Sequence, residues 1–250
     1  MCTIGVAFSL NATYVFKNRD LSQKVLMDDP EIREGKHKYV AFPRPGGGIW
    51  FGVNEMGVAL TASDAHVTKR YPVQKDAGDK ITRIYEDIVA NASTLKEAEE
   101  IMTGSFEKMI KVPDMVIVAD SRKACAYEYT PEKQAIVRRI KGGVLRANSF
   151  RVLSGALSRK EDLSSHLRYE RARELIFKRI SLAQVKKMLR DHKNGPGENS
   201  ICRHGKKEGE YTTQYSAVAE IKKRVIDVYY VGNKNPCLGE YEKIRIRQNG

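Results

Sequence analysis

The chain has 250 residues, which is enough to bury a large hydrophobic core without disulfide bonds. Charged residues make up 30% of it and the formal net charge is +13, a balance that would suit an acidic partner. However, the densest basic stretches are mixed with Glu and Asp and contain no RNA-recognition motif, which argues against nucleic-acid binding. The cysteines form no CxxC pair and no finger-like spacing with histidine, so neither a disulfide framework nor a zinc module is indicated.

Targeting and membrane signals are missing from the printed sequence. It shows no basic leader followed by an apolar run, and no stretch of about 18 consecutive apolar residues. We therefore expect a cytoplasmic protein that does not span a membrane, folded as one domain over residues 1–250. Antiparallel sheet edges and a basic surface leave a homo-oligomer open.

The first third of the chain is dominated by β-prone segments. Two short runs on either side of Asn11, within residues 3–16, predict a hairpin. A polar stretch rich in Pro and Gly follows Asp20 and predicts irregular structure. Two further strands, "IWFGVN" and "GVALTASD", are joined by a turn at residues 54–57.

Two amphipathic helices are predicted next. In "KITRIYEDIVANA" isoleucine and tyrosine recur at helical spacing after Asp79, which we take as the N-cap. In "STLKEAEEIM" either Ser93 or Thr94 is the N-cap, and Glu97 is placed to complete a capping box.

The remaining sequence repeats this alternation of strands and helices. We expect strands in "DMVIVAD", "KACAYEYTP", "QAIVRRI" and "GVLRANSF", and then helices in "SSHLRYERARELIFKRI" and "SLAQVKKMLRDH", the latter capped by Ser181. The last strands are "SICRHG", "TQYSAVAEIKK", "RVIDVYYVG" and "YEKIRIR". Because strands come in adjacent runs rather than one per helix, the order predicts an α+β fold, a four-layer αββα sandwich of two mainly antiparallel sheets.

Cys2 is a candidate nucleophile. If Met1 is removed, one residue carries both a thiol and a free α-amine, whose ordinary pKa of about 7.7 to 8.0 lets it accept and return the thiol proton. The plainer readings are a small buried hydrophobic residue on an edge strand and an incidental residue at a frayed terminus.

A nucleophile of this kind needs a carboxylate to hold the amine, a cation to favour the thiolate and donors for the oxyanion. The stretch "KNRD" at residues 17–20 offers cations, an amide and a carboxylate, although it could equally be an exposed turn. Asn148 ends a β run, where asparagine is either a donor or a turn former. Arg168 and Arg171 share one helix face, which could also be merely solvated.

Other Cys and His residues have plainer interpretations. Asp191-His192 and Cys202-Arg203-His204 resemble a catalytic pair or metal ligands, but we assign them structural or pocket-lining roles. His66 is incidental, or borders a substrate cleft.

Together these motifs resemble one family over nearly the whole chain. Cys2 with Thr3, "FKNRD", "GVNEMGV", "LRANSF", "SSHLRYERAR", "LRDHKNGPGENSICRHG" and "NPC" occur in the order found in the acyl-coenzyme A:6-aminopenicillanic acid acyltransferase-like family. This family belongs to the N-terminal nucleophile (Ntn) hydrolases and is related to choloylglycine hydrolases and penicillin V acylases. The resemblance implies an αββα fold.

The resemblance also implies roles for residues near the N-terminus. Cys2 corresponds to the family's nucleophile, and Asp20 to the carboxylate that holds its amine. Lys17 occupies the position of the family's common arginine; it supplies the charge without the bidentate fork, and Arg19 is an alternative cation.

Further roles follow for residues later in the chain. Asn148 matches the oxyanion donor, and Arg168 within the "SSHLR" segment matches a second active-site arginine. A further asparagine of the bile salt hydrolase branch is expected close to Asp79, where this chain has none, so backbone N–H groups would act instead. This departure argues against bile acids and penicillin V as substrates.

The predicted function is cleavage of a linear C–N amide bond in a small N-acyl amide, through an acyl-thioester on Cys2, with no cofactor and no metal. Acyl transfer or cysteine dipeptidase activity at the same site remains open. A rival of another class is a non-catalytic binding protein for an acidic partner.

Overall fold

Two antiparallel sheets form the centre of the computed structural model, which describes residues 2–65, 67, 76–109, 112–139, 141–153, 159–176 and 180–248. The first sheet has the order β10 (Gly143–Arg146), β1 (Cys2–Phe8), β2 (Thr13–Leu21), β11 (Thr212–Ile221), β12 (Val225–Val231) and β13 (Glu242–Arg247). The second has the order β3 (Glu31–Glu34), β4 (Lys38–Pro43), β5 (Ile49–Asn54), β6 (Ala59–Asp64), β7 (Asp114–Ala119), β8 (Ala124–Tyr129) and β9 (Gln134–Arg139).

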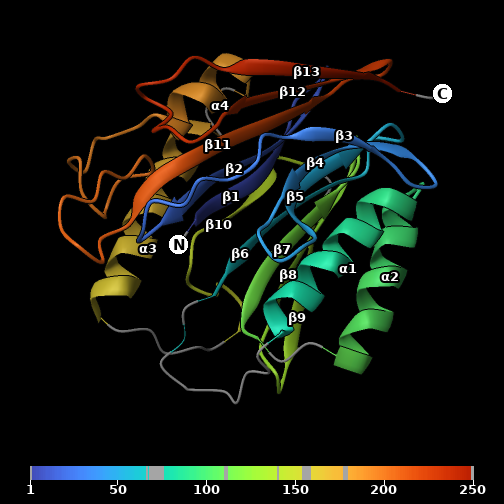
Figure 1. The fold of residues 1–250 in the computed structure, drawn as a ribbon, viewed down its shortest axis with the longest axis horizontal. Coiled ribbons are helices and arrows are strands. Elements are labelled where there is room, and N and C mark those ends of the chain that lie inside the picture. Colours follow the sequence, from blue (N-terminus) through green and yellow to red (C-terminus); the bar gives the residue numbers. More distant parts are fainter. Residues whose placement is uncertain are drawn as a thin grey trace.

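Two helix pairs lie on opposite sides of these sheets (Figure 1). Helices α1 (Ala77–Asn91) and α2 (Leu95–Met109) pack on the second sheet, and α3 (Arg159–Ile176) and α4 (Leu182–Leu189) pack on the first. A third apolar cluster fills the space between the sheets. The four-layer αββα sandwich predicted from the sequence is therefore confirmed. No helix within the described ranges is both long enough and apolar enough to cross a membrane.

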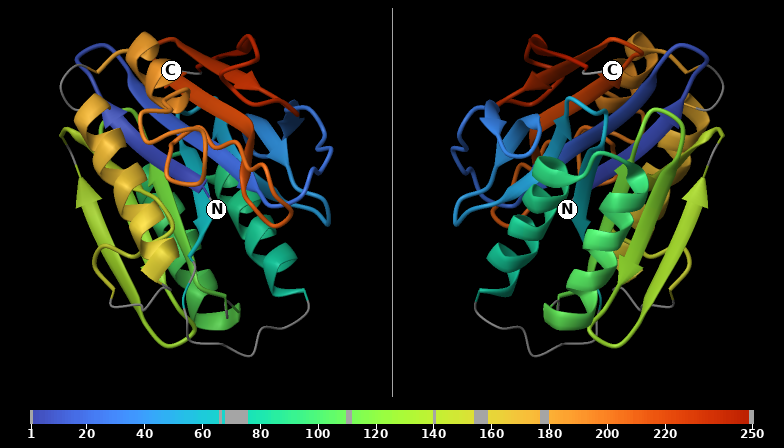
Figure 2. Two further views of the ribbon diagram at one scale, coloured as in Figure 1. Left: turned by 90° about the vertical axis from the view of Figure 1, so that its left-hand side faces the viewer. Right: turned by 90° about the vertical axis from the view of Figure 1, so that its right-hand side faces the viewer.

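Alternation along β1 and β2 decides what each side chain faces. Cys2, Ile4 and Val15 belong to the core between the sheets, whereas Phe16 belongs to the core under α3 and α4. Because successive strand residues point to opposite faces, Lys17 and Arg19 share the inter-sheet face with Cys2, and Asp20 shares the helix face with Phe16. Figure 2 shows the N-terminal end of the described chain near the middle of the molecule, between the two helix pairs.

Most predicted elements are confirmed. The hairpin around Asn11 is β1–β2, and the turn before β6 contains Gly57 at φ 83°, a conformation that glycine adopts at no steric cost. Thr94 caps α2, since its Oγ1 accepts the N–H of Glu97 at 3.2 Å, while the Glu97 carboxylate accepts the N–H of Ser93 at 3.0 Å. Ser181 caps α4 through the N–H of Gln184.

Three local predictions are wrong. The stretch after Asp20 contains β3 and β4; β3 is an edge strand whose polar, mostly exposed residues give no apolar alternation. Helix α1 begins at Ala77 with Asp76 as N-cap, so Asp79 lies in its first turn. The segment "SICRHG" is not a strand, because the N–H groups of Cys202 and His204 bind the carbonyls of Asp191 and Pro196 instead of a ladder partner.

Candidate active site

Cys2 begins β1 and is 6% exposed. Its cross-strand partner on β2 is Arg19, and its side chain faces the space between the two sheets. Pairing with β2 and packing in the core between the sheets explain why Cys2 is buried although it stands at the start of the strand. The reading as a frayed terminus is therefore excluded for Cys2. Met1 lies outside the described residues.

A cavity of about 460 Å³ opens beside Cys2. Strands of both sheets and the start of α1 line it, so it lies where the two sheets separate at one end of the sandwich. Its polar lining combines the cations Lys17, Arg19 and Arg44 with the carboxylates Asp20, Asp64, Asp79 and Asp114. Trp50 and Tyr85 contribute aromatic surface. This volume accommodates a small molecule.

Asn148 contacts Cys2 directly. Its Oδ1 accepts the backbone N–H of Cys2 at 3.1 Å, and its Nδ2 donates to Ser63 Oγ at 3.2 Å and to the carbonyl of Asp64 at 2.9 Å. Its own backbone N–H donates to Ser165 Oγ at 3.0 Å. Asn148 therefore links the start of β1, the end of β6 and helix α3.

Arg168 reaches the same point from α3. Its Nη2 donates to Asn148 Oδ1 at 2.9 Å, and its Nη1 donates to the carbonyl of Cys2 at 3.1 Å and to Thr3 Oγ1 at 3.3 Å. Burial, together with the neighbouring charge of Arg203, lowers the pKa of Arg168 to about 10. Arg171 instead binds Asp191 at 2.7 Å, away from Cys2. The structure thus brings Arg168, and not Arg171, to Cys2.

Lys17 and Arg19 are two cationic side chains that line the cavity together with Cys2. The Lys17 Nζ lies 4.9 Å from the ring centre of Trp50, and the Arg19 guanidinium lies 5.0 Å from it. The ammonium of Lys17 also donates to the carbonyl of Ala62. Burial lowers the pKa of both cations, and the thiol of Cys2 is the leading influence in the opposite direction. Both candidates for the cationic role therefore face the thiol.

Asp20 lies on the other face of β2. Its Oδ1 accepts the Thr213 hydroxyl at 2.7 Å, and its Oδ2 lies 3.6 Å from Nη1 of Arg203. Since Cys2 pairs with Arg19, the next ladder position, at Asp20, lies opposite the point where the chain enters β1. The contact described for the Cys2 nitrogen is with Asn148, and the expected role of Asp20 stays a prediction.

The carboxylates Asp64 and Asp114 were not anticipated. They are register partners on β6 and β7, and both line the cavity. Asp114 accepts the Tyr85 hydroxyl at 2.7 Å. Burial, followed by the charge of Asp64, raises the pKa of Asp114 to about 7. The sequence signal that could have identified them is a carboxylate at the start or end of a buried apolar strand, as in "DMVIVAD".

Two further expectations concern the borders of the site. Among the described residues that line the cavity there is no asparagine near Asp79, in agreement with the sequence. His66 lies outside the described residues.

This fold and site define a class. Two antiparallel sheets between two helix layers are the arrangement of the Ntn hydrolase fold. The chain belongs to the acyl-coenzyme A:6-aminopenicillanic acid acyl-transferase family, whose model matches residues 9–235. No curated protein matches the chain.

Solved structures share the fold. The C2A mutant of conjugated bile acid hydrolase from Clostridium perfringens is 13% identical with a TM-score of 0.57, and the match covers 99% of this chain and 98% of that one. Penicillin V acylase from Agrobacterium tumefaciens is 15% identical with a TM-score of 0.60, covering 99% of this chain and 86% of that one.

Proposed function

We propose that this protein is an Ntn cysteine amidohydrolase that cleaves linear amide bonds of small N-acyl substrates. The observation that carries the proposal is the placement of Cys2: its side chain lines the cavity while its nitrogen binds Asn148, which Arg168 holds in turn. Membership of the family supports a hydrolase or acyltransferase reaction. The solved neighbours are named conjugated bile acid hydrolase and penicillin V acylase, which is consistent with hydrolysis of an acyl amide.

In the proposed reaction, Met1 has been removed and the α-amine of Cys2 takes the thiol proton. The thiolate attacks the amide carbonyl, and the tetrahedral intermediate collapses when the protonated amine returns that proton to the leaving nitrogen. An acyl-thioester on Cys2 remains. Water then attacks the thioester with the same amine as base, which releases the carboxylic acid and restores the thiol.

Neighbouring side chains have separate roles in this scheme. Lys17 and Arg19 favour the thiolate by their charge, and Asp20 orients the amine from the end of the β1–β2 ladder. Asn148 Nδ2 donates to the oxyanion, since its longer bond, the one to Ser63 at 3.2 Å, is the one that a substrate oxygen would replace. Arg168 is a positioning residue, because its contacts are with Asn148 and the backbone of Cys2.

Acyl transfer is the second candidate, favoured by the description of the family. It differs from hydrolysis only in the group that attacks the thioester, an amine instead of water. Adding an amine acceptor during turnover distinguishes the two reactions. Formation of a new amide at the expense of free acid supports transfer, whereas unchanged release of acid supports hydrolysis.

The proposed function is tested with a substrate panel of N-acyl amino acids, phenoxyacetyl and arylacetyl amides, and dipeptides. Release of amine and acid by the wild-type protein, and loss of this activity in Cys2→Ala, is the expected result. A matched control is Cys125→Ala, which removes a thiol from β8 rather than from the cavity. Turnover that survives in Cys2→Ala would overturn the proposal. A panel without turnover, together with Cys2 that labels no faster than Cys125, would favour the non-catalytic alternative.

A further inference from the structure

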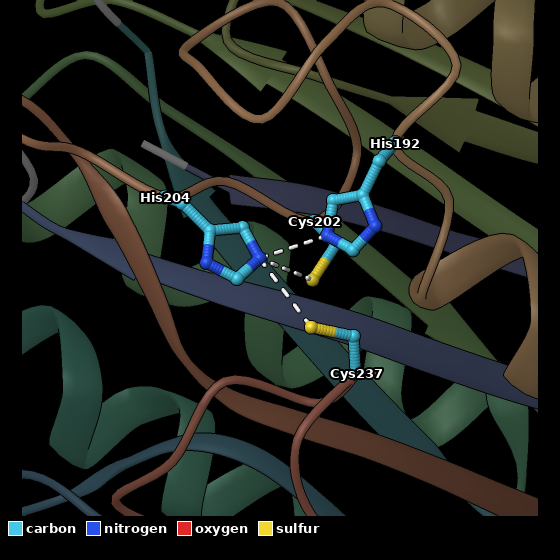
Figure 3. Close-up of side chains that lie close together, drawn as sticks. All are labelled: His192, Cys202, His204 and Cys237. Atoms are coloured by element: carbon cyan, nitrogen blue, oxygen red, sulfur yellow. Dashed lines mark hydrogen bonds between the residues drawn. The ribbon is translucent and has the colours of Figure 1, made fainter.

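Four side chains outside the active site converge on one point. Figure 3 shows the imidazole rings of His192 and His204 and the sulfurs of Cys202 and Cys237 directed toward each other. Their potential ligand atoms all lie within 4.8 Å of one another. His204 Nε2 lies 2.8 Å from His192 Nε2, 3.4 Å from Cys237 Sγ and 3.9 Å from Cys202 Sγ.

These residues come from two loops, the connection between α4 and β11 and the connection between β12 and β13. His192 follows α4, Cys202 and His204 precede β11, and Cys237 lies between β12 and β13. Cys202 and His204 are two positions apart in an irregular segment, and Cys202 Sγ lies 3.9 Å from His204 Nε2. Because no two of the four have the spacing of a known zinc module, the sequence pattern did not predict the cluster.

Hydrogen bonds fix the loops in this arrangement. The N–H of Cys202 donates to the carbonyl of Asp191 at 3.1 Å, which ties the two ends of the α4–β11 loop together. Arg190 donates to the carbonyls of Pro236 at 2.8 Å and Gly239 at 2.7 Å, which ties the β12–β13 loop to the end of α4. The two loops are therefore held by hydrogen bonds that do not involve the four side chains.

The donor set selects the kind of ion. Two imidazole nitrogens and two sulfurs form the Cys₂His₂ set of structural zinc sites, whereas Mg²⁺ and Ca²⁺ prefer oxygen ligands. The Cys202 side chain is fully buried and the other three are half-buried, which suits an enclosed structural ion rather than one open to substrate. Asn235 Oδ1 accepts the thiol protons of Cys202 at 2.7 Å and Cys237 at 3.0 Å, so it holds the two sulfurs side by side before those protons are released on metal binding.

We propose that His192, Cys202, His204 and Cys237 bind one structural zinc ion in tetrahedral geometry. Binding forms two Zn–S and two Zn–N bonds and releases the two thiol protons to solvent. The ion is distinct from the reaction centre, since none of the four residues lines the cavity beside Cys2.

Arg203 connects the proposed zinc site to the active site. It lies between the two ligands Cys202 and His204, and its fully buried guanidinium lies 3.6 Å from Asp20. Its N–H donates to Thr213 Oγ1 at 2.9 Å, and the same hydroxyl donates to Asp20. A zinc ion bound by Cys202 and His204, the two neighbours of Arg203, therefore fixes the segment that contacts Asp20.

Metal content and a cobalt spectrum test the site. Protein purified under reducing conditions is expected to contain one zinc per chain by elemental mass spectrometry. Replacement by Co²⁺ is expected to give sulfur-to-cobalt charge-transfer absorption and the visible bands of a tetrahedral ion. Removal of zinc by a chelator is expected to lower Tm by about 5 °C or more, and added zinc to restore it.

Two variants and two controls complete the experiment. Cys237→Ser and His192→Gln are expected to lose most of the zinc and to change the cobalt spectrum, whereas Cys2→Ala and Cys125→Ala retain both. Because the cobalt spectrum is measured on the wild-type chain, a variant that fails to fold does not remove the test.

Several outcomes would overturn the proposal. They are wild-type protein that takes up neither zinc nor cobalt when reduced, metal that stays bound in both ligand variants, and a mass showing a Cys202–Cys237 disulfide in protein that binds no metal. The readouts are independent of amidase activity, so they also separate failure of this site from failure of the proposed reaction.

Discussion

Arg168 and Cys2 bind the same oxygen atom: Nη2 of the arginine donates to Asn148 Oδ1 at 2.9 Å, and the nitrogen of Cys2 donates to it at 3.1 Å. The amide oxygen of Asn148 therefore accepts two donors, and this fixes the direction of its Nδ2 group. This one oxygen atom thus positions both the nitrogen of the proposed nucleophile and the proposed oxyanion donor.

Arg168→Lys is expected to reduce kcat about tenfold to a hundredfold with little change in KM, because one ammonium cannot bind Asn148 and the Cys2 carbonyl as the guanidinium fork does. Steady-state kinetics on the best substrate measures the change. Arg173→Lys is the matched control, since Arg173 is exposed on the same helix and pairs with Glu170. Equal effects of the two substitutions would contradict the positioning role.

Asn148→Asp tests the donor side of Asn148. A carboxylate still accepts from Cys2 and Arg168, but it has no N–H for the oxyanion and faces the carbonyl of Asp64. We expect kcat to fall about 10²- to 10³-fold while Cys2 still reacts with iodoacetamide. Turnover close to wild type in Asn148→Asp would exclude Asn148 as an oxyanion donor.

Lys17→Met and Arg19→Met are each expected to slow alkylation of Cys2 about threefold to tenfold at neutral pH, because each removes a positive charge that favours the thiolate. Peptide mass spectrometry of iodoacetamide-treated protein measures the rate at Cys2. Arg44→Met is the matched control; Arg44 lines the same cavity but donates to the carbonyl of Gly78. If only one of the two variants slows alkylation, that residue fills the cationic role. Rates equal to the control in both variants would refute the assignment.

Asp114 is expected to make stability pH-dependent. Its pKa is about 7 in the folded protein and about 3.9 when unfolded, so between these values the folded state binds more protons. The free energy of unfolding should therefore fall as pH rises from about 4 to about 7, by up to about 4 kcal/mol from this group. Asp114→Asn should flatten this dependence, whereas exposed Asp87→Asn should retain it. Denaturant unfolding at several pH values checks the slope, and identical slopes in wild type and Asp114→Asn would contradict the assignment.

The fold was predicted from the periodic spacing of apolar residues and from helix-capping residues. The αββα layers follow from strands and helices whose buried faces are visible as local patterns, as with Thr94 and Ser181 at helix starts. The edge strand β3 was not predicted because its residues are mostly exposed, and an exposed strand needs no apolar alternation.

The candidate site residues that belong to recognisable sequence motifs could be predicted from the sequence. Cys2, Asn148 and Arg168 were named from the sequence, and the structure brings them into contact. Asp64 and Asp114 face each other because β6 and β7 pair across a long insertion that contains α1 and α2. A register between strands so far apart is set by tertiary packing and leaves no local signal.

The proposed N-terminal chemistry of Cys2 has a sharp test in the mass of the acyl-enzyme. Purified protein is mixed with a slowly hydrolysed acyl donor, quenched in acid, and examined by intact and peptide mass spectrometry. We predict a chain without Met1 that carries one acyl group on Cys2, and no adduct in Cys2→Ala. Full amidase activity in a chain that retains Met1, or an acyl group on any other residue, would contradict the mechanism.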